Sequence, residues 1–167
     1  MKKFILSLML LLPLSMVAQE AKIAVVKFYD VLTVMPEASD MENQLMALQE
    51  RYRAEMQSLE NEHNRKQSDL VNQQDSLTEN IKTMRIQEIQ DLQTRYENLY
   101  QMAQQDTEKK RDELFAPIQE KIQKAIDQVG DENNYTVIFM ANPNVILYMG
   151  KTAVDVTDQV KAKLGLK

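Results

Sequence analysis

Apolar residues in the middle of the chain recur at alternating spacings of three and four positions, as in the seam of a coiled coil. Residues 37–116 contain no glycine and no proline, and most positions between the apolar ones are charged or amide residues. A helix with so narrow an apolar strip cannot form a core alone and needs a second helix to cover it. The first apolar series is Met41, Leu45, Leu48, Tyr52, Met56, Leu59, His63, Lys66 and Leu70.

A second series follows a break at residues 73–79. Within this break Ser76 and Glu79 have the spacing of a capping box, which predicts the start of a new helix. The second series is Leu77, Ile81, Met84 and Glu88, continued by Ile89, Leu92, Tyr96, Leu99 and Ala103.

The two series are predicted to cover each other. A single helix over residues 37–129 would be about 140 Å long and would hold the two ends of the chain far apart. Both ends contain β-branched segments, and isolated strands with open edges aggregate. We therefore predict that the chain reverses near residues 73–79 into an antiparallel helical hairpin, which we call the arm. The alternative is one continuous rod in which Ser76 faces solvent.

Short β-rich segments flank the arm. Residues 22–28 predict a buried strand, residues 29–34 a short helix, and Pro36 the first turn of the arm. Pro117 is expected to kink the second helix, and Gly130 to end it as a C-cap glycine. The predicted C-terminal elements are a β-hairpin of residues 135–140 and 145–149, and a short helix over residues 156–165 capped by Asp155 or Thr157.

These elements predict a mostly helical α+β fold. Residues 19–36 and 117–167 form a discontinuous β body with short helices, and residues 37–116 form the arm. The body is small and the chain has no cysteine, so its stability is expected to come from packing and from association of several copies through their strands. The predicted residues of the body core and oligomer contact are Ile23, Val25, Val26, Val137, Phe139, Ile146 and Leu147.

The first 18 residues have the features of a secretory signal peptide. Two lysines precede a short apolar run that ends in small residues, and cleavage is predicted near Ala18. The run is shorter than the roughly 20 residues of a membrane span, which argues against the alternative of an uncleaved anchor. Cleavage leaves 18 basic and 25 acidic side chains, a net charge of −7. An acidic surface excludes nucleic acid as the expected partner.

No arrangement of residues predicts catalysis, a cofactor or a metal. The carboxylates are spread over polar helix faces, and the three glycines all lie at or beyond residue 130, where they form no phosphate-binding loop. His63 is the only histidine and is expected to lie on the surface. The sequence therefore predicts a protein that is not an enzyme.

The ends of the mature chain carry its most specific features. They are the opening Lys22-Ile23-Ala24-Val25-Val26, the entry Pro36-Glu37, the strand of residues 135–140, and the ending Asp155-Val156-Thr157-Asp158-Gln159-Val160. Together with the polar helical hairpin, these resemble the Skp/OmpH family of periplasmic chaperones. The resemblance implies a homotrimer with a β-barrel body and three arms around a cavity. It also implies an ATP-independent holdase for unfolded outer-membrane β-barrel proteins.

We carry over the fold and function of the family with one exception, the lipopolysaccharide site, and we keep one alternative function. This chain is acidic where the best-known members are strongly basic, so we carry over no lipopolysaccharide or membrane-surface site. Apolar contact is then the expected force on a client, and methionine and tyrosine suit a surface that accepts many sequences. The predicted contact residues are Met46, Met56, Met84, Tyr96 and Met102. For Met56 and Met84, filling the seam is the alternative role, and for the whole protein the alternative is a structural coiled-coil scaffold of the envelope.

A short motif in the break has two interpretations. Asp75-Ser76-Leu77 resembles the Asp-Ser/Thr-apolar acceptor of O-glycosylation in some envelope-bearing bacteria. Helix capping by Ser76 would explain the same residues. The sequence alone leaves both open.

Overall fold

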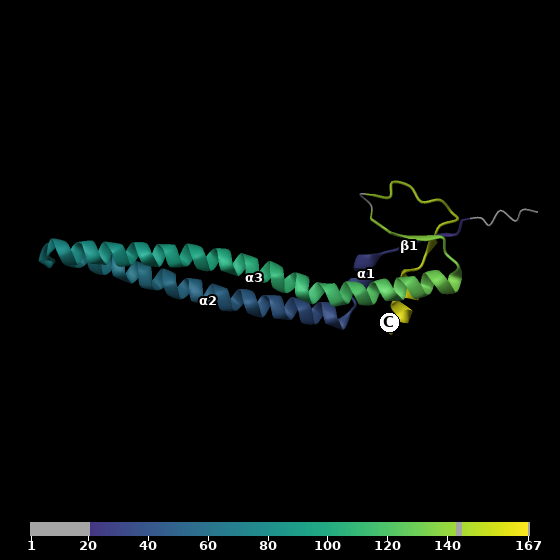
Figure 1. The fold of residues 1–167 in the computed structure, drawn as a ribbon, viewed down its shortest axis with the longest axis horizontal. Coiled ribbons are helices and arrows are strands. Elements are labelled where there is room, and N and C mark those ends of the chain that lie inside the picture. Colours follow the sequence, from purple (N-terminus) through teal and green to yellow (C-terminus); the bar gives the residue numbers. More distant parts are fainter. Residues whose placement is uncertain (1–20, 143–144, 167) are drawn as a thin grey trace, which may run out of the picture.

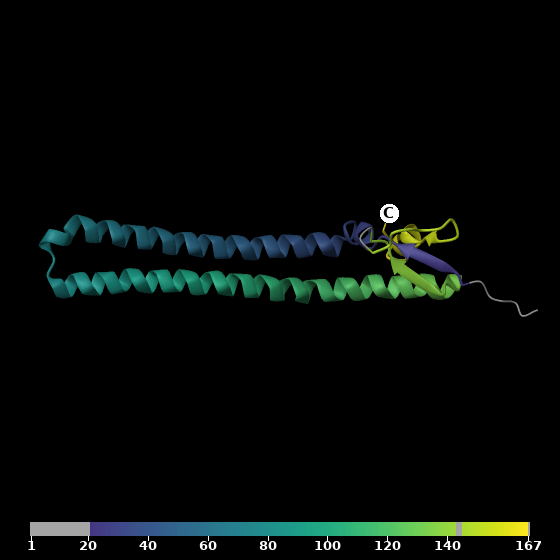
Figure 2. The ribbon, with the colours of Figure 1, turned by 90° about the horizontal axis from the view of Figure 1, so that it is seen from above.

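Two long helices lie side by side and form the arm (Figures 1 and 2). The computed structural model describes residues 21–142 and 145–166; the predicted signal peptide of residues 1–18 lies outside this part of the chain and stays a prediction. Helix α2 (Pro36–Gln73, 38 residues) starts at the predicted proline and is about 57 Å long. Helix α3 (Glu79–Asn133, 55 residues) returns beside it and continues into the body. The predicted reversal is confirmed, and the continuous rod is wrong.

The turn at the far end of the arm differs from the predicted capping box. A short 3₁₀ helix η2 (Gln74–Ser76) prolongs α2, and the Ser76 hydroxyl donates a hydrogen bond of 2.8 Å to the carbonyl of Gln73. Thr78, with extended backbone angles, takes the N-cap position of α3 instead. Ser76 therefore does not cap α3, because it belongs to the last turn of the preceding helical segment.

The seam between the helices follows the predicted series on α2, whose members are all buried or half-buried. On α3 the series from Ile89 to Ala103 also faces inward. Nearer the turn the prediction was wrong, since Ile81 and Met84 are exposed. Lys82 and Arg85 occupy the seam there, because their positions continue the spacing of Ile89 and their aliphatic stems tolerate burial while the charged ends reach solvent.

The body is built on a parallel three-stranded sheet. Strand β1 (Ile23–Val26) lies in the middle, with β2 (Val137–Met140) on one side and β3 (Val154–Asp155) on the other. Ile23 pairs with Val137 and Ala24 with Val154, and both pairings are parallel. The side chains of the middle strand are buried from Ala24 to Val26.

The predicted C-terminal β-hairpin is therefore wrong. Only its first strand exists, as β2, and residues 145–149 are not a strand. Both edges of β1 are occupied by β2 and β3, so the intervening segment must pass from one edge of the sheet to the other. Its apolar residues consequently find little cover within this chain, and Leu147 is 92% exposed.

The C-terminal part of α3 covers the sheet and forms the core of the body. The core contains Ala24, Val26, Val31, Met35, Ile118, Ile122, Ala125, Val129, Val156 and Val160. Short helices α1 (Phe28–Leu32) and α4 (Thr157–Lys163) complete it. α3 continues through Pro117 as one helix and changes direction between arm and body (Figure 1). It ends at Asn133 rather than at Gly130, because Asn134 adopts the left-handed conformation (φ 53°) that asparagine tolerates.

Candidate functional site

Four polar contacts join the two helices of the arm at intervals along its length. From the body to the turn they are Glu37–Lys121, Tyr52–Asp106, Lys66–Glu88 and Gln73–Arg85. The Lys66–Glu88 and Arg85–Gln73 distances are 2.7 and 3.0 Å. The hydrogen bond from Lys121 lowers the pKa of the Glu37 carboxyl. Because these contacts fix the register of the helices, they determine which side chains face away from the seam.

Tyr52 is the most deeply placed of these residues. It is 6% exposed, and its hydroxyl donates a hydrogen bond to a carboxylate oxygen of Asp106. This bond and partial burial raise the pKa of the Tyr52 hydroxyl, since ionisation would place a second negative charge beside Asp106. On the residue next to Asp106, the buried Thr107 hydroxyl donates to the Ala103 carbonyl at 2.6 Å. The middle of the arm is thus held by satisfied polar groups rather than by a reactive constellation.

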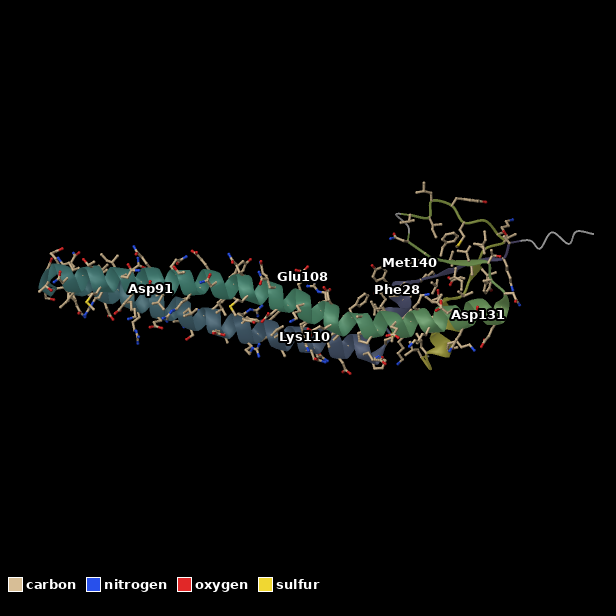
Figure 3. All side chains as sticks on the ribbon, in the orientation of Figure 1. Phe28, Asp91, Glu108, Lys110, Asp131 and Met140 are labelled. Atoms are coloured by element: carbon tan, nitrogen blue, oxygen red, sulfur yellow. The ribbon has the colours of Figure 1, made fainter. Side chains whose placement is uncertain are left out.

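Open grooves lie beside the seam at several levels of the arm. A groove of about 580 Å³ is lined by Tyr52, Met56 and Tyr100, and one of about 730 Å³ near the body by Met41, Leu45 and Met46. Charged and amide side chains project along the arm, among them Asp91 and Glu108 (Figure 3), and Glu108 also lines the first groove together with Arg53 and Arg111. The arm therefore offers small apolar areas separated by well-solvated polar surface.

The predicted contact residues fall into two groups. Met46, Met84 and Met102 are more than half exposed, at 55%, 63% and 54%. Met56 and Tyr96 are half-buried on the seam side, Tyr96 beside His63 in another groove. Filling the seam is thus the role of Met56 but not of Met84. His63, expected on the surface, is half-buried for the same reason.

Sequence analysis missed an apolar area close to the turn. Val71, Ile81 and Ile86 are exposed there, together with Met84. A usable signal was present, since counting back from Leu92 in steps of three and four reaches Ile89, Arg85 and Lys82. That count puts the charged residues in the seam and leaves the apolar ones outside it.

The body presents a second exposed apolar area. Of the residues predicted for its core and oligomer contact, Val25 and Val26 are buried, Val137 and Ile146 half-buried, and Ile23, Phe139 and Leu147 exposed. The exposed ones are joined by Met140, labelled in Figure 3, and by Val145, Tyr148, Met149 and Val154. Where arm and body meet, the rings of Phe28 and Phe115 pack edge to face with centroids 6.5 Å apart.

The described residues carry neither a metal-binding cluster nor a membrane-crossing helix. Within residues 21–142 and 145–166, no three Asp, Glu or His side chains converge to hold a metal ion. Over the same residues, every helix is too short or too polar to span a bilayer.

Comparisons with known proteins agree with this geometry. Residues 22–164 match the model of a family described as "Outer membrane protein (OmpH-like)". The fold is similar to that of a candidate outer membrane chaperone (OmpH-like) from Caulobacter crescentus CB15, with a TM-score of 0.73 and 12% sequence identity over 86% of this chain and 83% of that one. The search of curated proteins found no match. Because the family model covers most of the chain, from the first strand to the last helix, this protein belongs to the OmpH-like outer membrane protein family.

Proposed function

We propose that this protein is an ATP-independent periplasmic holdase that binds unfolded outer-membrane β-barrel proteins between the arms of a homotrimer. The OmpH-like family is periplasmic, and its chaperones are not enzymes, in agreement with the expectation from the sequence. The observation that carries the proposal is the exposure of Met46, Met84, Met102 and Tyr100 along a polar arm. Flexible thioethers and tyrosine rings contact many apolar sequences weakly.

The distribution of these residues supports holding rather than folding a client. Each exposed side chain is separated from the next by charged and amide residues, so a client is bound at several weak points. Weak contacts at many points keep an unfolded chain soluble without fixing its conformation. A client released from them needs no nucleotide, only a competing site of higher affinity.

The proposal is tested by aggregation of a client. An outer-membrane β-barrel unfolded in urea is diluted into buffer without nucleotide, and its light scattering is followed. The mature protein at stoichiometric concentration is expected to suppress the scattering. The triple variant Met46→Ser, Met84→Ser, Met102→Ser is expected to lose a large part of this effect, because the three most flexible of the exposed apolar contacts on the arm are removed.

A matched control separates client contact from general damage to the arm. Gln44→Ser, Gln67→Ser and Gln101→Ser change three exposed polar positions on the same helices. This variant is expected to act like the unchanged protein. If the unchanged protein fails to reduce scattering, the holdase proposal is wrong and the structural scaffold becomes the better assignment.

The exposed area of the body supports the oligomeric part of the proposal. A body that leaves apolar residues such as Leu147 and Tyr148 in solvent is a poor end state for a monomer, and covering these residues with other copies removes that cost. An assembly joined through the bodies directs several arms away from one centre. The space between them is the proposed client site.

A further inference from the structure

The turn at the end of the arm carries the motif Asp75-Ser76-Leu77, which the proposed chaperone function does not use. We propose that Ser76 is an O-glycosylation site, modified by an envelope glycosyltransferase that takes its sugar from a diphosphate-linked donor. This inference goes beyond the holdase proposal and does not depend on it.

The backbone around Ser76 is unlike the rest of the arm. Residues 36–133 are all described, and within them only Leu77 and Thr78 lie outside helical or 3₁₀ structure. Both have extended angles, with ψ of 142° and 156°. A transferase must enclose the acceptor hydroxyl and its flanking residues, which an uninterrupted helix resists and an exposed turn permits.

The motif is accessible. Residues 71–76 are all exposed, and Leu77 is half-buried. The Ser76 hydroxyl donates its proton to the Gln73 carbonyl, so its oxygen lone pairs remain on the solvent side of that bond. The acceptor oxygen is therefore available without unfolding either helix.

The structure removes the competing explanation of the motif. A Ser76–Glu79 capping box would account for Asp-Ser-Leu at a helix start, but Thr78 holds the N-cap position. Ser76 instead makes one exposed local hydrogen bond, to the Gln73 carbonyl at the end of α2. N-capping of α3 thus no longer explains why a serine follows Asp75.

The same chain contains an internal control. Asp106-Thr107-Glu108 also places a hydroxyl residue after an aspartate, but an acidic residue follows in place of an apolar one. Thr107 is 9% exposed, and its hydroxyl is bonded to the Ala103 carbonyl inside α3. Thr107 lacks all three features of the proposed acceptor: a following apolar residue, an exposed hydroxyl and a break in the helix. Ser76 therefore differs from an ordinary pair of aspartate and hydroxyl residue.

The transfer balances without a redox partner. The Ser76 oxygen forms a bond to the anomeric carbon of the sugar as the bond from that carbon to the diphosphate breaks. The diphosphate leaves with the bonding electron pair, and the hydroxyl proton passes to a base of the transferase. The product is a glycoside on the arm turn.

The test is the intact mass of the protein purified from the envelope of its own host, followed by peptide mapping. We expect a mass above that of the mature polypeptide, with the added glycan on the peptide containing Ser76. Ser76→Ala and Asp75→Asn are expected to lose the glycan completely. Ser76→Thr keeps the acceptor hydroxyl and is expected to retain it, as is the control Thr107→Val.

Two results would overturn the assignment. One is an unmodified mass for the unchanged protein, and the other is a glycan that persists in Ser76→Ala or in Asp75→Asn. Circular dichroism of each variant verifies that the arm is intact, which is expected because residues 75 and 76 lie outside the seam. Suppression of client aggregation is measured on protein made without the transferase, so the two proposals fail separately.

Discussion

Tyr52 combines packing and polar contact in one side chain. Its ring lies in the seam among mostly aliphatic and thioether groups, and its hydroxyl reaches Asp106 on the facing helix. A tyrosine in a seam is expected to need such a partner, since a buried hydroxyl without one is costly. The two parts of this side chain should therefore contribute separately to stability.

Removing only the hydroxyl of Tyr52 is predicted to lower the free energy of unfolding less than removing the whole ring. Tyr52→Phe should lower the free energy of unfolding by about 1 kcal/mol, because Asp106 is exposed and regains water. Tyr52→Ala should cost roughly 3 kcal/mol through the cavity it leaves. Urea unfolding followed by circular dichroism measures both, and Tyr100→Phe, half exposed, serves as the neutral control. Equal losses for the two Tyr52 variants would contradict this division.

Asp155 joins the end of β1 to the start of α4. It accepts hydrogen bonds from the backbone and hydroxyl of Thr157 and lies 3.2 Å from the Lys27 amine. Burial alone would raise the pKa of the Asp155 carboxyl, but the bonds from Thr157 and Lys27 outweigh burial and lower it. The charged form is thus favoured in the folded protein, and it stabilises the fold above the unfolded pKa of about 4.

A pH-dependent loss of stability follows from that lowered pKa. As pH falls from about 5 through the folded pKa, protonation removes the contribution of Asp155. Asp155→Asn should therefore lower the urea midpoint at neutral pH and differ little from the unchanged protein near pH 2. The control Asp112→Asn, an exposed residue of α3, should show no such difference. A constant gap at both pH values would show that Asp155 acts through packing alone.

At the scale of elements, the antiparallel arm determines distances between remote residues. Because the chain has no cysteine, single cysteines introduced at exposed Gln57 and Gln101 accept unique spin labels. Labelled chains diluted with unlabelled ones are expected to give a short distance across the arm. A straight helix would place these residues about 66 Å apart. Labels at Gln101 and Gln123, both on α3, provide a reference of about 33 Å.

The arm was predictable because its information is local and repeated. Most turns of α2 contribute an apolar residue at the expected spacing, so the polar positions His63 and Lys66 do not shift the series. Near the turn the repetition ends, and there Lys82 and Arg85 entered the seam although Ile81 and Met84 are more apolar. Their charged ends reach Glu79 and Gln73, contacts that no hydrophobic pattern records.

The sheet was less predictable because its pairings are non-local. Residues 135–140 and 145–149 are apolar, β-prone and joined by a turn, which is the local signature of a hairpin. The second partner of β1 is instead the two-residue β3, too short to show a periodicity. Which strand pairs with β1 depends on the cover that α3 and α4 give the body, and these contacts join residues far apart in the sequence.

At the scale of the whole molecule, the exposed part of the body predicts self-association. Light scattering of the mature protein is expected to give about three times the mass of one chain, as the proposed trimer requires. Leu147→Asp should lower that mass, because a charge at a 92% exposed apolar position opposes burial against another copy. Lys151→Asp, exposed in the same segment, is the matched control. If the unchanged protein is a monomer in solution, no space enclosed by several arms exists, and the proposed client site is wrong.

The central position of β1 affects how a chain synthesised from its N-terminus matures. β1 emerges first, yet its neighbours are the last two strands, and the hydrogen bond from Lys22 to Thr136 spans 114 positions. The two helices of the arm can pair, starting from their turn, well before β2 and β3 are synthesised. Their contacts nearest the turn join residues that are close in sequence, and such contacts form fast. Until Val154 and Asp155 arrive, the edge of β1 opposite β2 has no partner strand. A stop codon before Val154 would leave that edge of β1 open permanently.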